Sequence, residues 1–172
     1  MSEPSVLRRR YSCRSFAPDP LPDGDLASVL EAARWAPSAG NLQPWRFVVV
    51  TARALRLELA GAAHQDFVAE APVVIAVCAV PGESAGRYGT RGRSLYCLQD
   101  TAAATQNILL AATELGLGSC WVGAFEEDTV SSALGLPPAW RPVALVPLGR
   151  AREKAAARTR RSLADAVVYR TA

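Results

Sequence analysis

A polar loop over residues 37–45 holds the side chains whose types and spacing best suit ligand binding. Pro37 ends a helical pattern, Gly40 permits a positive φ, and the short polar side chains around it are Ser38, Asn41 and Gln43. Donors and acceptors on such a rigid frame suit a flat heterocyclic ligand. A polar turn between a helix and a strand, with no ligand, explains the same residues about equally well.

The basic stretch 8–16 adds residue types that suit a phosphate group. A phosphate dianion is best held by two or more guanidinium groups together with a hydroxyl or backbone donors, and Arg10 and Ser12 supply both kinds of group. Arg158 or Arg160, in a second basic stretch late in the chain, can complete this set. A solvated basic tail is the alternative interpretation of that second stretch.

The two stretches together resemble the nitroreductase family of FMN-dependent oxidoreductases. That family begins with an Arg-x-Ser-x-Arg-x-Phe pattern, which here runs from Arg10 to Phe16. Its first helix is followed by Ala-Pro-Ser-x-x-Asn-x-Gln-Pro-Trp, which here occupies residues 36–45. Further segments fit in the same order, namely Asp100, Gln106, Asn107, residues 116–123 and the late arginines. The resemblance therefore covers nearly the whole chain.

The resemblance implies FMN as the cofactor and gives each polar residue a place around it. Arg10, Ser12 and Arg160 are implied at the phosphate. Arg14 is implied at the pyrimidine end of the ring, where a fixed guanidinium stabilises the negative charge of the reduced flavin and raises its reduction potential. Family members supply the 37–45 loop from the neighbouring subunit. The complete implied set of cofactor-binding residues, with no catalytic residue and no metal ligand, is Arg10, Tyr11, Ser12, Arg14, Pro37, Ser38, Asn41, Gln43, Gln65, Trp121, Val122, Gly123, Arg158 and Arg160.

The implied activity is a transfer of electrons in two steps. NAD(P)H, as co-substrate, reduces the flavin and leaves, and an electron-poor acceptor such as a nitro compound or a quinone then takes the electrons in the same pocket. Some relatives carry Glu at the position of Gly123, so here the backbone amide is the remaining donor to flavin N5 and the acceptor class stays open. The alternatives are a specialised family member (a flavin-fragmenting enzyme, a dehalogenase or a peptide-ring dehydrogenase) and a non-catalytic flavin-binding protein.

Composition and charge argue against several other classes. The formal net charge of +3, from 19 basic and 16 acidic residues, is too small to indicate nucleic-acid binding. No apolar stretch has the length of a membrane span or of a signal peptide, so we expect a cytoplasmic protein with no membrane contact. The four cysteines are widely spaced and there is one histidine, which leaves too few ligands for a zinc site.

The hydrophobic pattern predicts alternating helices and strands. Helices are expected over Asp25–Ala36, Arg53–Ala63, Cys97–Leu115 and Thr129–Leu134. Asp23 or Asp25 can cap the first of these, and Gly116 stops the third. Strands are expected over Phe47–Thr51, Val73–Val80, Cys120–Phe125 and Pro142–Gly149. The prolines of the last strand favour an edge position or irregular ends.

These elements predict an α+β fold or α/β sandwich in a single domain over residues 1–172. A mobile loop is expected over residues 81–95, and a short apolar segment over Leu163–Tyr169 closes the chain. The resemblance further implies a central mixed sheet flanked by helices in an intertwined homodimer. The alanine-rich helix Cys97–Leu115 is our candidate for its central contact.

Two short motifs match other kinds of site but lack the required context. Gly82–Gly86 reads G-x-S-x-G after a strand, as in the nucleophile elbow of a hydrolase. The single histidine, His64, precedes Ser84, so the chain order of that catalytic triad cannot be assembled. Gly116-x-Gly118 follows a helix and lacks a third glycine, so no separate dinucleotide-binding domain is expected.

Overall fold

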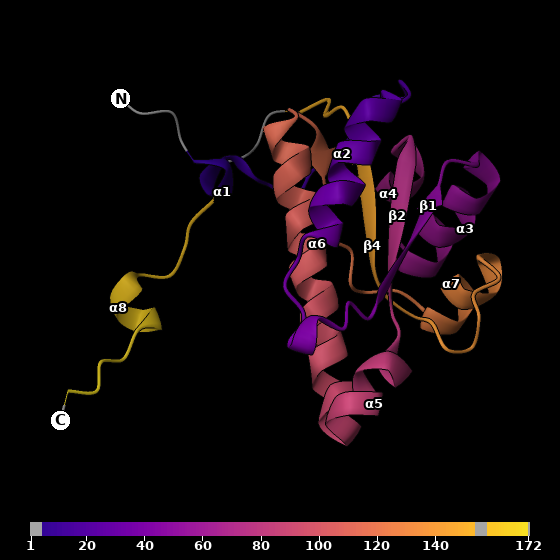
Figure 1. The fold of residues 1–172 in the computed structure, drawn as a ribbon. Coiled ribbons are helices and arrows are strands. Elements are labelled where there is room, and N and C mark those ends of the chain that lie inside the picture. The colour runs from indigo at the N-terminus through magenta and orange to yellow at the C-terminus, as the bar shows by residue number, and fades with distance from the viewer. Residues whose placement is uncertain (1–4, 154–157, 172) are drawn as a thin grey trace.

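The computed structural model describes residues 5–153 and 158–171, and its four-stranded sheet lies between two layers of helices (Figure 1). The strands are β1 (Trp45–Val50), β2 (Val73–Ala79), β3 (Gly118–Ser119) and β4 (Arg141–Gly149), and their order in the sheet is β1-β2-β4-β3. The pairs of strands are antiparallel, and an isolated bridge between Ser12 and Ser119 adds a parallel contact. The expected α+β fold with a helix-flanked sheet is confirmed, and the mixed character of the sheet rests on that bridge.

Eight α-helices are present among the described residues: α1 (Val6–Arg9), α2 (Asp23–Arg34), α3 (Arg53–Ala63), α4 (Phe67–Glu70), α5 (Pro81–Arg91), α6 (Cys97–Glu114), α7 (Glu127–Ala133) and α8 (Leu163–Ala166). A 3-10 turn, η1, covers Ala39–Asn41, and a π-helix, η2, covers Gly92–Tyr96. In this part of the chain no helix combines the length and the hydropathy that a membrane span requires.

Strand β2 is buried along its whole length because helices cover both faces of the sheet. Its odd-numbered residues, from Val73 to Val77, pack with α2 and α6. The even-numbered residues Val74 and Ala76 pack with α3, α4 and α7 on the opposite face. The uninterrupted apolar run in the sequence is therefore the result of burial on two sides.

Helix α6 is the longest helix and runs through the centre of one layer (Figure 1). Its buried residues include Ala104, Ile108 and Ala112, which recur at the same face of the helix because they are spaced four residues apart. Asn107 of α6 donates to the carbonyl of Ala32 at 2.9 Å, which ties α2 to this helix. The helix ends at Glu114, and Gly116 adopts a φ of 72°, which is the left-handed stop expected from the sequence.

The chain after β4 leaves the body of the molecule. Figure 1 shows α8 and the C-terminal end lying well apart from the sheet and its helices. Leu163, Val168 and Tyr169 are 74%, 72% and 80% exposed. This C-terminal arm (residues 158–171) therefore presents apolar side chains that no other described segment of the chain covers.

The prediction of a mobile loop over residues 81–95 is wrong, because these residues form α5 and most of the π-helix η2. Pro81 stands in the first turn of α5, where its missing N–H costs nothing. Gly89 bends the helix with φ of 58° and ψ of −140°. At Gly92 a Cβ would collide with the carbonyl of the buried Ser84, so close packing holds a helix that glycine-rich composition disfavours.

Two expectations about strands also need correction. Residues Cys120–Phe125 do not form a strand, because β3 ends at Ser119 and only Val122 makes an isolated bridge, to Leu145. Of the two alternatives for the prolines of β4, the edge position is wrong, since β4 lies between β2 and β3, whereas an irregular end is observed. Its prolines are tolerated there because Pro142 lies at an irregularity in the pairing with β2 and because β3 pairs with only the last residues of β4.

The predicted start of α2 needs a smaller correction. The helix begins at Asp23, two residues earlier than expected, and its N-cap residue is Pro22. Neither aspartate makes a capping hydrogen bond through its side chain; Asp23 and Asp25 instead lie in the first turn, where their charges favour the positive end of the helix dipole.

Candidate functional site

The N-terminal motif, residues 10–16, is held against the chain segment that follows α6. Ser12 forms the parallel bridge to Ser119, and the N–H of Cys13 donates to the carbonyl of Ser119 at 2.9 Å. The two segments lie so close together that a Cβ at Gly118 would lie 2.7 Å from the sulfur of Cys13. The motif therefore lies directly beside the beginning of the 120–123 segment.

Two of the predicted arginines gather at the same place. Arg158 Nη2 donates to the carbonyl of Ser12 at 3.4 Å, which joins the C-terminal arm to the N-terminal motif. Burial raises the pKa of the Cys120 thiol, and the nearby charges of Arg14 and Arg158 and a hydrogen bond with Ser12 oppose that rise. Ser12, Arg14 and Arg158 thus lie close enough to Cys120 to influence its thiol, and together they form what we call the arginine–serine group.

The other residues predicted in this region, Arg10, Tyr11 and Arg160, have no described contact with the arginine–serine group. Arg10 is half-buried at the end of α1. Tyr11 donates its hydroxyl hydrogen to the carbonyl of Glu153 at 3.0 Å, and burial raises the pKa of this phenol. Arg160 is exposed and donates to the carbonyl of Thr159, so no described contact joins it to the motif.

The backbone of residues 121–123 lies at the surface beside the arginine–serine group. Val122 is buried and exchanges two backbone hydrogen bonds of 2.9 Å with Leu145, which fixes the segment to β4. Trp121 is 39% exposed, and Gly123 is exposed, with Trp121 Nε1 3.8 Å from where a Cβ would stand. Among the described residues, the N–H of Gly123 has no hydrogen-bond acceptor.

Gln65 follows α3 and is half-buried, with its backbone N–H bonded to the carbonyl of Ala60. The neighbouring His64 is exposed and lies 3.2 Å from Glu126, as expected of a surface residue at a helix end. No described contact joins the Gln65 side chain to the arginine–serine group.

The 37–45 loop has an unusual backbone that its own side chains support. Gly40, Asn41 and Gln43 have φ values of 58°, 56° and 52°. The left-handed region costs about 1–2 kcal/mol for each residue that carries a side chain, so Asn41 and Gln43 store strain. The hydroxyl of Ser38 accepts from the N–H of Gln43 at 3.0 Å, and the Gln43 amide donates to Asn41 at 3.3 Å. Pro37 precedes this frame and is exposed.

Asp100 anchors the same loop to α6, and sequence reasoning missed this role. Its Oδ1 accepts from the N–H of Ala39 at 3.0 Å, whereas its Oδ2 is buried without a hydrogen-bond partner in the described part of the chain. Burial raises the pKa of this carboxyl group, and the Ala39 hydrogen bond opposes the rise. An acidic residue on an otherwise buried helix face was the available signal.

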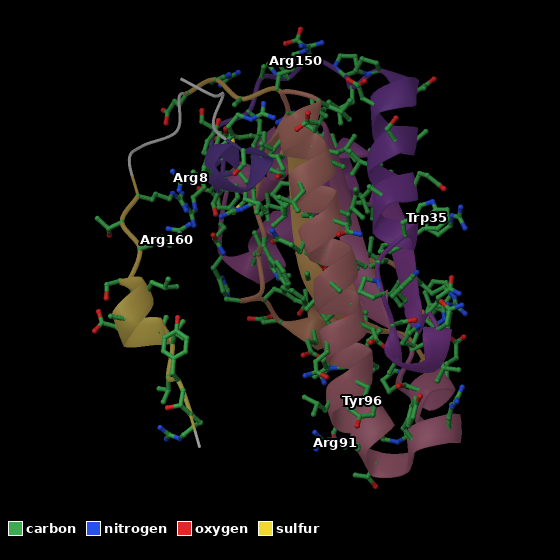
Figure 2. The ribbon with its side chains drawn as sticks, turned by 60° about the vertical axis from the view of Figure 1, so that its left-hand side comes forward. Arg8, Trp35, Arg91, Tyr96, Arg150 and Arg160 are labelled. Carbon is green, nitrogen blue, oxygen red and sulfur yellow. The ribbon has the colours of Figure 1, made fainter. Side chains whose placement is uncertain are left out.

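The loop and the arginine–serine group lie at opposite ends of α6. Asp100 holds the loop near the beginning of the helix, and Glu114 at its end pairs with Arg9 at 2.7 Å. At 1.5 Å per residue these two anchors are about 20 Å apart. Figure 2 agrees, since Arg91 and Tyr96 lie at one end of the molecule and Arg8 and Arg150 toward the other. One chain therefore does not bring the two predicted halves of a flavin site together.

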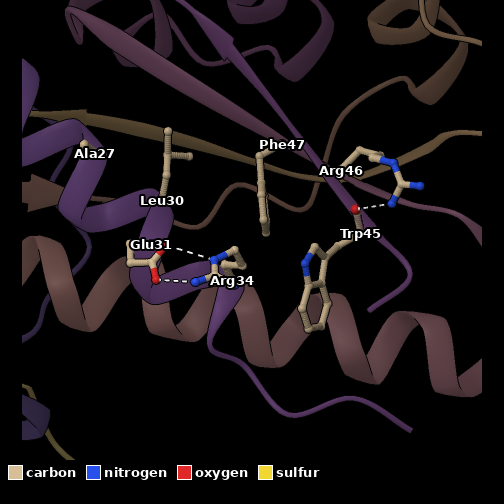
Figure 3. Close-up of a pocket in the computed structure, with 7 residues that line it drawn as sticks. All are labelled: Ala27, Leu30, Glu31, Arg34, Trp45, Arg46 and Phe47. Carbon is tan, nitrogen blue, oxygen red and sulfur yellow. Dashed lines mark hydrogen bonds and ion pairs between the residues drawn. The ribbon is translucent and has the colours of Figure 1, made fainter. Parts of the chain in front are cut away.

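A groove between α2 and β1 lies outside all predicted site residues (Figure 3). Its volume is about 440 Å³, and it is lined by Ala27, Leu30, Glu31, Arg34, Trp45, Arg46 and Phe47. Two hydrogen bonds of 2.9 and 2.5 Å hold the Arg34 guanidinium on Glu31, so its charge is already paired. Nothing in this groove carries a redox or binding role for the predicted ligand.

The G-x-S-x-G motif has no accessible nucleophile. Ser84 lies in α5 and is fully buried, and its hydroxyl has no hydrogen-bond partner among the described residues. A nucleophile elbow requires an exposed serine at a sharp turn between a strand and a helix.

Comparisons with known proteins agree on one family. The sequence model described as "Nitroreductase family" matches residues 7–67 and 60–150. An NADH dehydrogenase from Thermus thermophilus is 34% identical, with 96% of this chain and 94% of that protein covered. A 5,6-dimethylbenzimidazole synthase from Rhodospirillum rubrum is 32% identical over 87% of this chain and 82% of that protein. The crystal structure of a nitroreductase family protein from Clostridium difficile 630 superposes with a TM-score of 0.85 at 31% identity, covering 96% of both chains.

Proposed function

Because the chain belongs to the nitroreductase family, we propose that it is an FMN-dependent oxidoreductase that uses NAD(P)H to reduce an electron-poor acceptor such as a nitro compound or a quinone. We assign this activity to one nitroreductase-like domain over residues 1–172. The observation that carries the proposal is the meeting of Ser12, Arg14 and Arg158 near Cys120. Beside them, Trp121 and Gly123 are exposed and Val122 is buried.

The donors of the arginine–serine group fit the phosphate of FMN. Within the group, Ser12 offers a hydroxyl and Arg158 a guanidinium. From outside it, Arg10 can add a second guanidinium, and the buried hydroxyl of Ser119 has no hydrogen-bond partner among the described residues. The family resemblance favours Arg160 as the late arginine, whereas the contact with Ser12 favours Arg158. Arg158→Ala and Arg160→Ala decide between them, since the residue on the phosphate should weaken FMN binding by about ten- to a hundredfold when removed.

The residues beside Cys120 fit the ring of the flavin. When bound, FMN supplies the electron transfer, so the protein is required to hold and tune the ring rather than to provide a nucleophile. Arg14 offers a fixed positive charge for the pyrimidine end, and Gln65 offers an amide there. The unpaired N–H of Gly123 is a donor for N5, and the bond of Val122 to Leu145 keeps that donor in place.

The loop at the other end of α6 requires a second copy of the chain to reach the same flavin. We therefore propose an intertwined homodimer in which each flavin takes Ser38, Asn41 and Gln43 from one copy and the arginine–serine group from the other. The exposed apolar residues of the C-terminal arm support an exchange of arms between the copies. A shallow apolar hollow of about 350 Å³ on the outer side of α6, between Val6, Asn107 and Ala111, supports this helix as a central contact.

One spectrum followed by one titration tests the proposal. The purified protein should be yellow, mass spectrometry of the released cofactor should give FMN, and anaerobic NADPH or NADH should bleach the flavin absorbance. A protein that releases FAD or riboflavin, or binds no flavin after reconstitution, contradicts the cofactor assignment. Bound FMN that neither coenzyme reduces would indicate a non-catalytic flavin protein. Light scattering should give a dimer, and a flavin-loaded monomer at micromolar concentration would contradict the shared site.

A second function, cleavage of the flavin itself, is favoured by the similarity to a 5,6-dimethylbenzimidazole synthase and by the absence of a side chain at the exposed Gly123. The two functions are separated by incubating the protein with reduced FMN in air and analysing the products. Loss of FMN together with the appearance of 5,6-dimethylbenzimidazole would establish the second function. Unchanged FMN with steady consumption of NAD(P)H and acceptor would establish the first.

A further inference from the structure

Two arginines and two tyrosines on α5 and η2 form a cluster that the proposed function has not used: Arg87, Tyr88, Arg91 and Tyr96, here called the Arg/Tyr cluster. The two tyrosine rings meet edge to face, with centroids 5.2 Å apart. Each ring carries a guanidinium, Arg87 at 5.5 Å from the Tyr88 centroid and Arg91 at 5.3 Å from the Tyr96 centroid. Arg91 Nε also donates to the Tyr96 hydroxyl at 2.9 Å, and Figure 2 shows these two side chains together.

The positive charge of this cluster is not neutralised within the described part of the chain. Neither Arg87 nor Arg91 forms an ion pair with a carboxylate there. The acid on the same helix, Glu83, is paired with Arg46 at 2.5 Å. Arg93, which is exposed on η2, adds a further positive charge. A ligand with a compact anionic group is the natural counterpart of such a surface.

The cluster lies directly against the loop that we assign to the flavin. A Cβ at Gly40 would lie 2.6 Å from the Tyr88 hydroxyl and 2.9 Å from Arg87 Nη1. Only glycine at this position allows both side chains to approach the loop so closely. A molecule that stacks on a flavin held by this loop would therefore lie beside the Arg/Tyr cluster.

The backbone under the cluster is fixed rather than loose. The ring contact between Tyr88 and Tyr96 joins α5 to η2, and the close approach of Gly92 to Ser84 holds the two segments together. Short π-helical segments are frequent at functional sites, where they reorient side chains at some cost in stability.

We propose that the Arg/Tyr cluster binds the 2′-phosphate and adenine of NADPH, and thereby selects NADPH over NADH as the reductant. The exposed guanidinium groups of Arg87 and Arg91 offer planar faces for adenine, and a guanidinium pairs with a phosphate through two parallel hydrogen bonds. NADH lacks the 2′-phosphate and leaves both arginines without a counter-charge. This inference rests on the proposed function, because the nicotinamide end requires the flavin.

Calorimetric titration of the FMN-loaded protein with 2′,5′-ADP and with 5′-AMP tests the inference without turnover. The wild-type protein should bind 2′,5′-ADP at least tenfold more tightly than 5′-AMP. Arg87→Gln and Arg91→Gln should each remove most of that difference while the FMN content stays the same. Arg53→Gln, an exposed arginine at the start of α3, is the matched control and should change nothing.

Equal affinity for the two nucleotides, or an unchanged preference in both cluster variants, would overturn the assignment to the 2′-phosphate. In steady state the ratio of kcat/KM for NADPH to that for NADH should fall toward unity in the same variants. A wild-type ratio near unity would likewise count against the inference. Failure of the proposed function is distinguishable, because it appears as absent FMN or as FMN that neither coenzyme reduces.

Discussion

Gly40 has a left-handed backbone and close neighbours, and it lies in the loop that we assign to the flavin. The loss of folding stability in Gly40→Ala can therefore be worked out from the structure. An alanine at φ of 58° loses about 1–2 kcal/mol relative to its preferred backbone region. The added Cβ would also approach the Tyr88 hydroxyl and Arg87 Nη1 to 2.6 and 2.9 Å. Both are ends of flexible side chains, so they can move aside at little further cost. We therefore expect a total loss of about 1–2 kcal/mol, or a fall in Tm of about 2–8 °C.

Gly135→Ala is a matched control, because Gly135 has a φ of 57° and nothing within 4 Å of an added Cβ. Urea unfolding of both variants should give similar losses of stability, since both contain the same backbone strain. Only Gly40→Ala should also weaken FMN binding, because the strain falls in the loop that we assign to the flavin. It should also lower the preference for 2′,5′-ADP, because its Cβ displaces Tyr88 and Arg87. If Gly40→Ala binds FMN and 2′,5′-ADP like the wild type, the reasoning about this loop is refuted.

Three further changes test other parts of the site. Arg10→Ala and Arg158→Ala should each weaken FMN binding by about ten- to a hundredfold with little change in the reduction potential of the flavin, whereas Arg14→Ala should mainly lower that potential. Flavin fluorescence measures the binding and redox titration measures the potential. Equal shifts of the potential in all three variants would contradict the assignment. Burial raises the pKa of Asp100 in the folded protein above its value of about 4 in the unfolded chain. The contribution of Asp100 to the free energy of unfolding is therefore complete below about pH 4 and is lost as pH rises through the pKa of the folded state. Asp100→Asn should therefore gain stability relative to the wild type as pH rises from about 4 to 7 in urea unfolding, and a constant difference would refute the assignment. Removal of residues 162–172 should convert the dimer to monomer in light scattering and reduce FMN affinity, and an unaltered dimer would exclude a role of α8 in assembly.

Elements that depend on local sequence could be predicted well. The helix Arg53–Ala63 was predicted with its observed limits, because its apolar residues repeat with helical spacing. The strand Val73–Ala79 followed from an apolar run bounded by prolines. The polar frame of the 37–45 loop also followed from its glycine and short polar side chains.

Elements that depend on tertiary packing could not be predicted. Residues 81–96 contain four glycines and form helix only because Ser84 and Gly92 pack against each other, which no local pattern reveals. Cys120–Phe125 has the composition of a strand, but beyond Ser119 only Val122 pairs with β4. The bond between Asp100 and Ala39 joins residues far apart in the sequence, so its place in the site became visible only in the fold.

Because the 37–45 loop and the N-terminal motif lie at opposite ends of α6, two defective variants of the chain should be able to complement each other. If each flavin uses the N-terminal motif of one copy and the loop of the other, a dimer of Arg10→Ala with Gly40→Ala has both defects in one site and none in the other. Two variants that are each defective alone should then restore activity when unfolded together and refolded as a mixture. With random pairing of equal amounts, about a quarter of all sites would be intact. The defects at the two ends of α6 would in this way complement each other across the dimer.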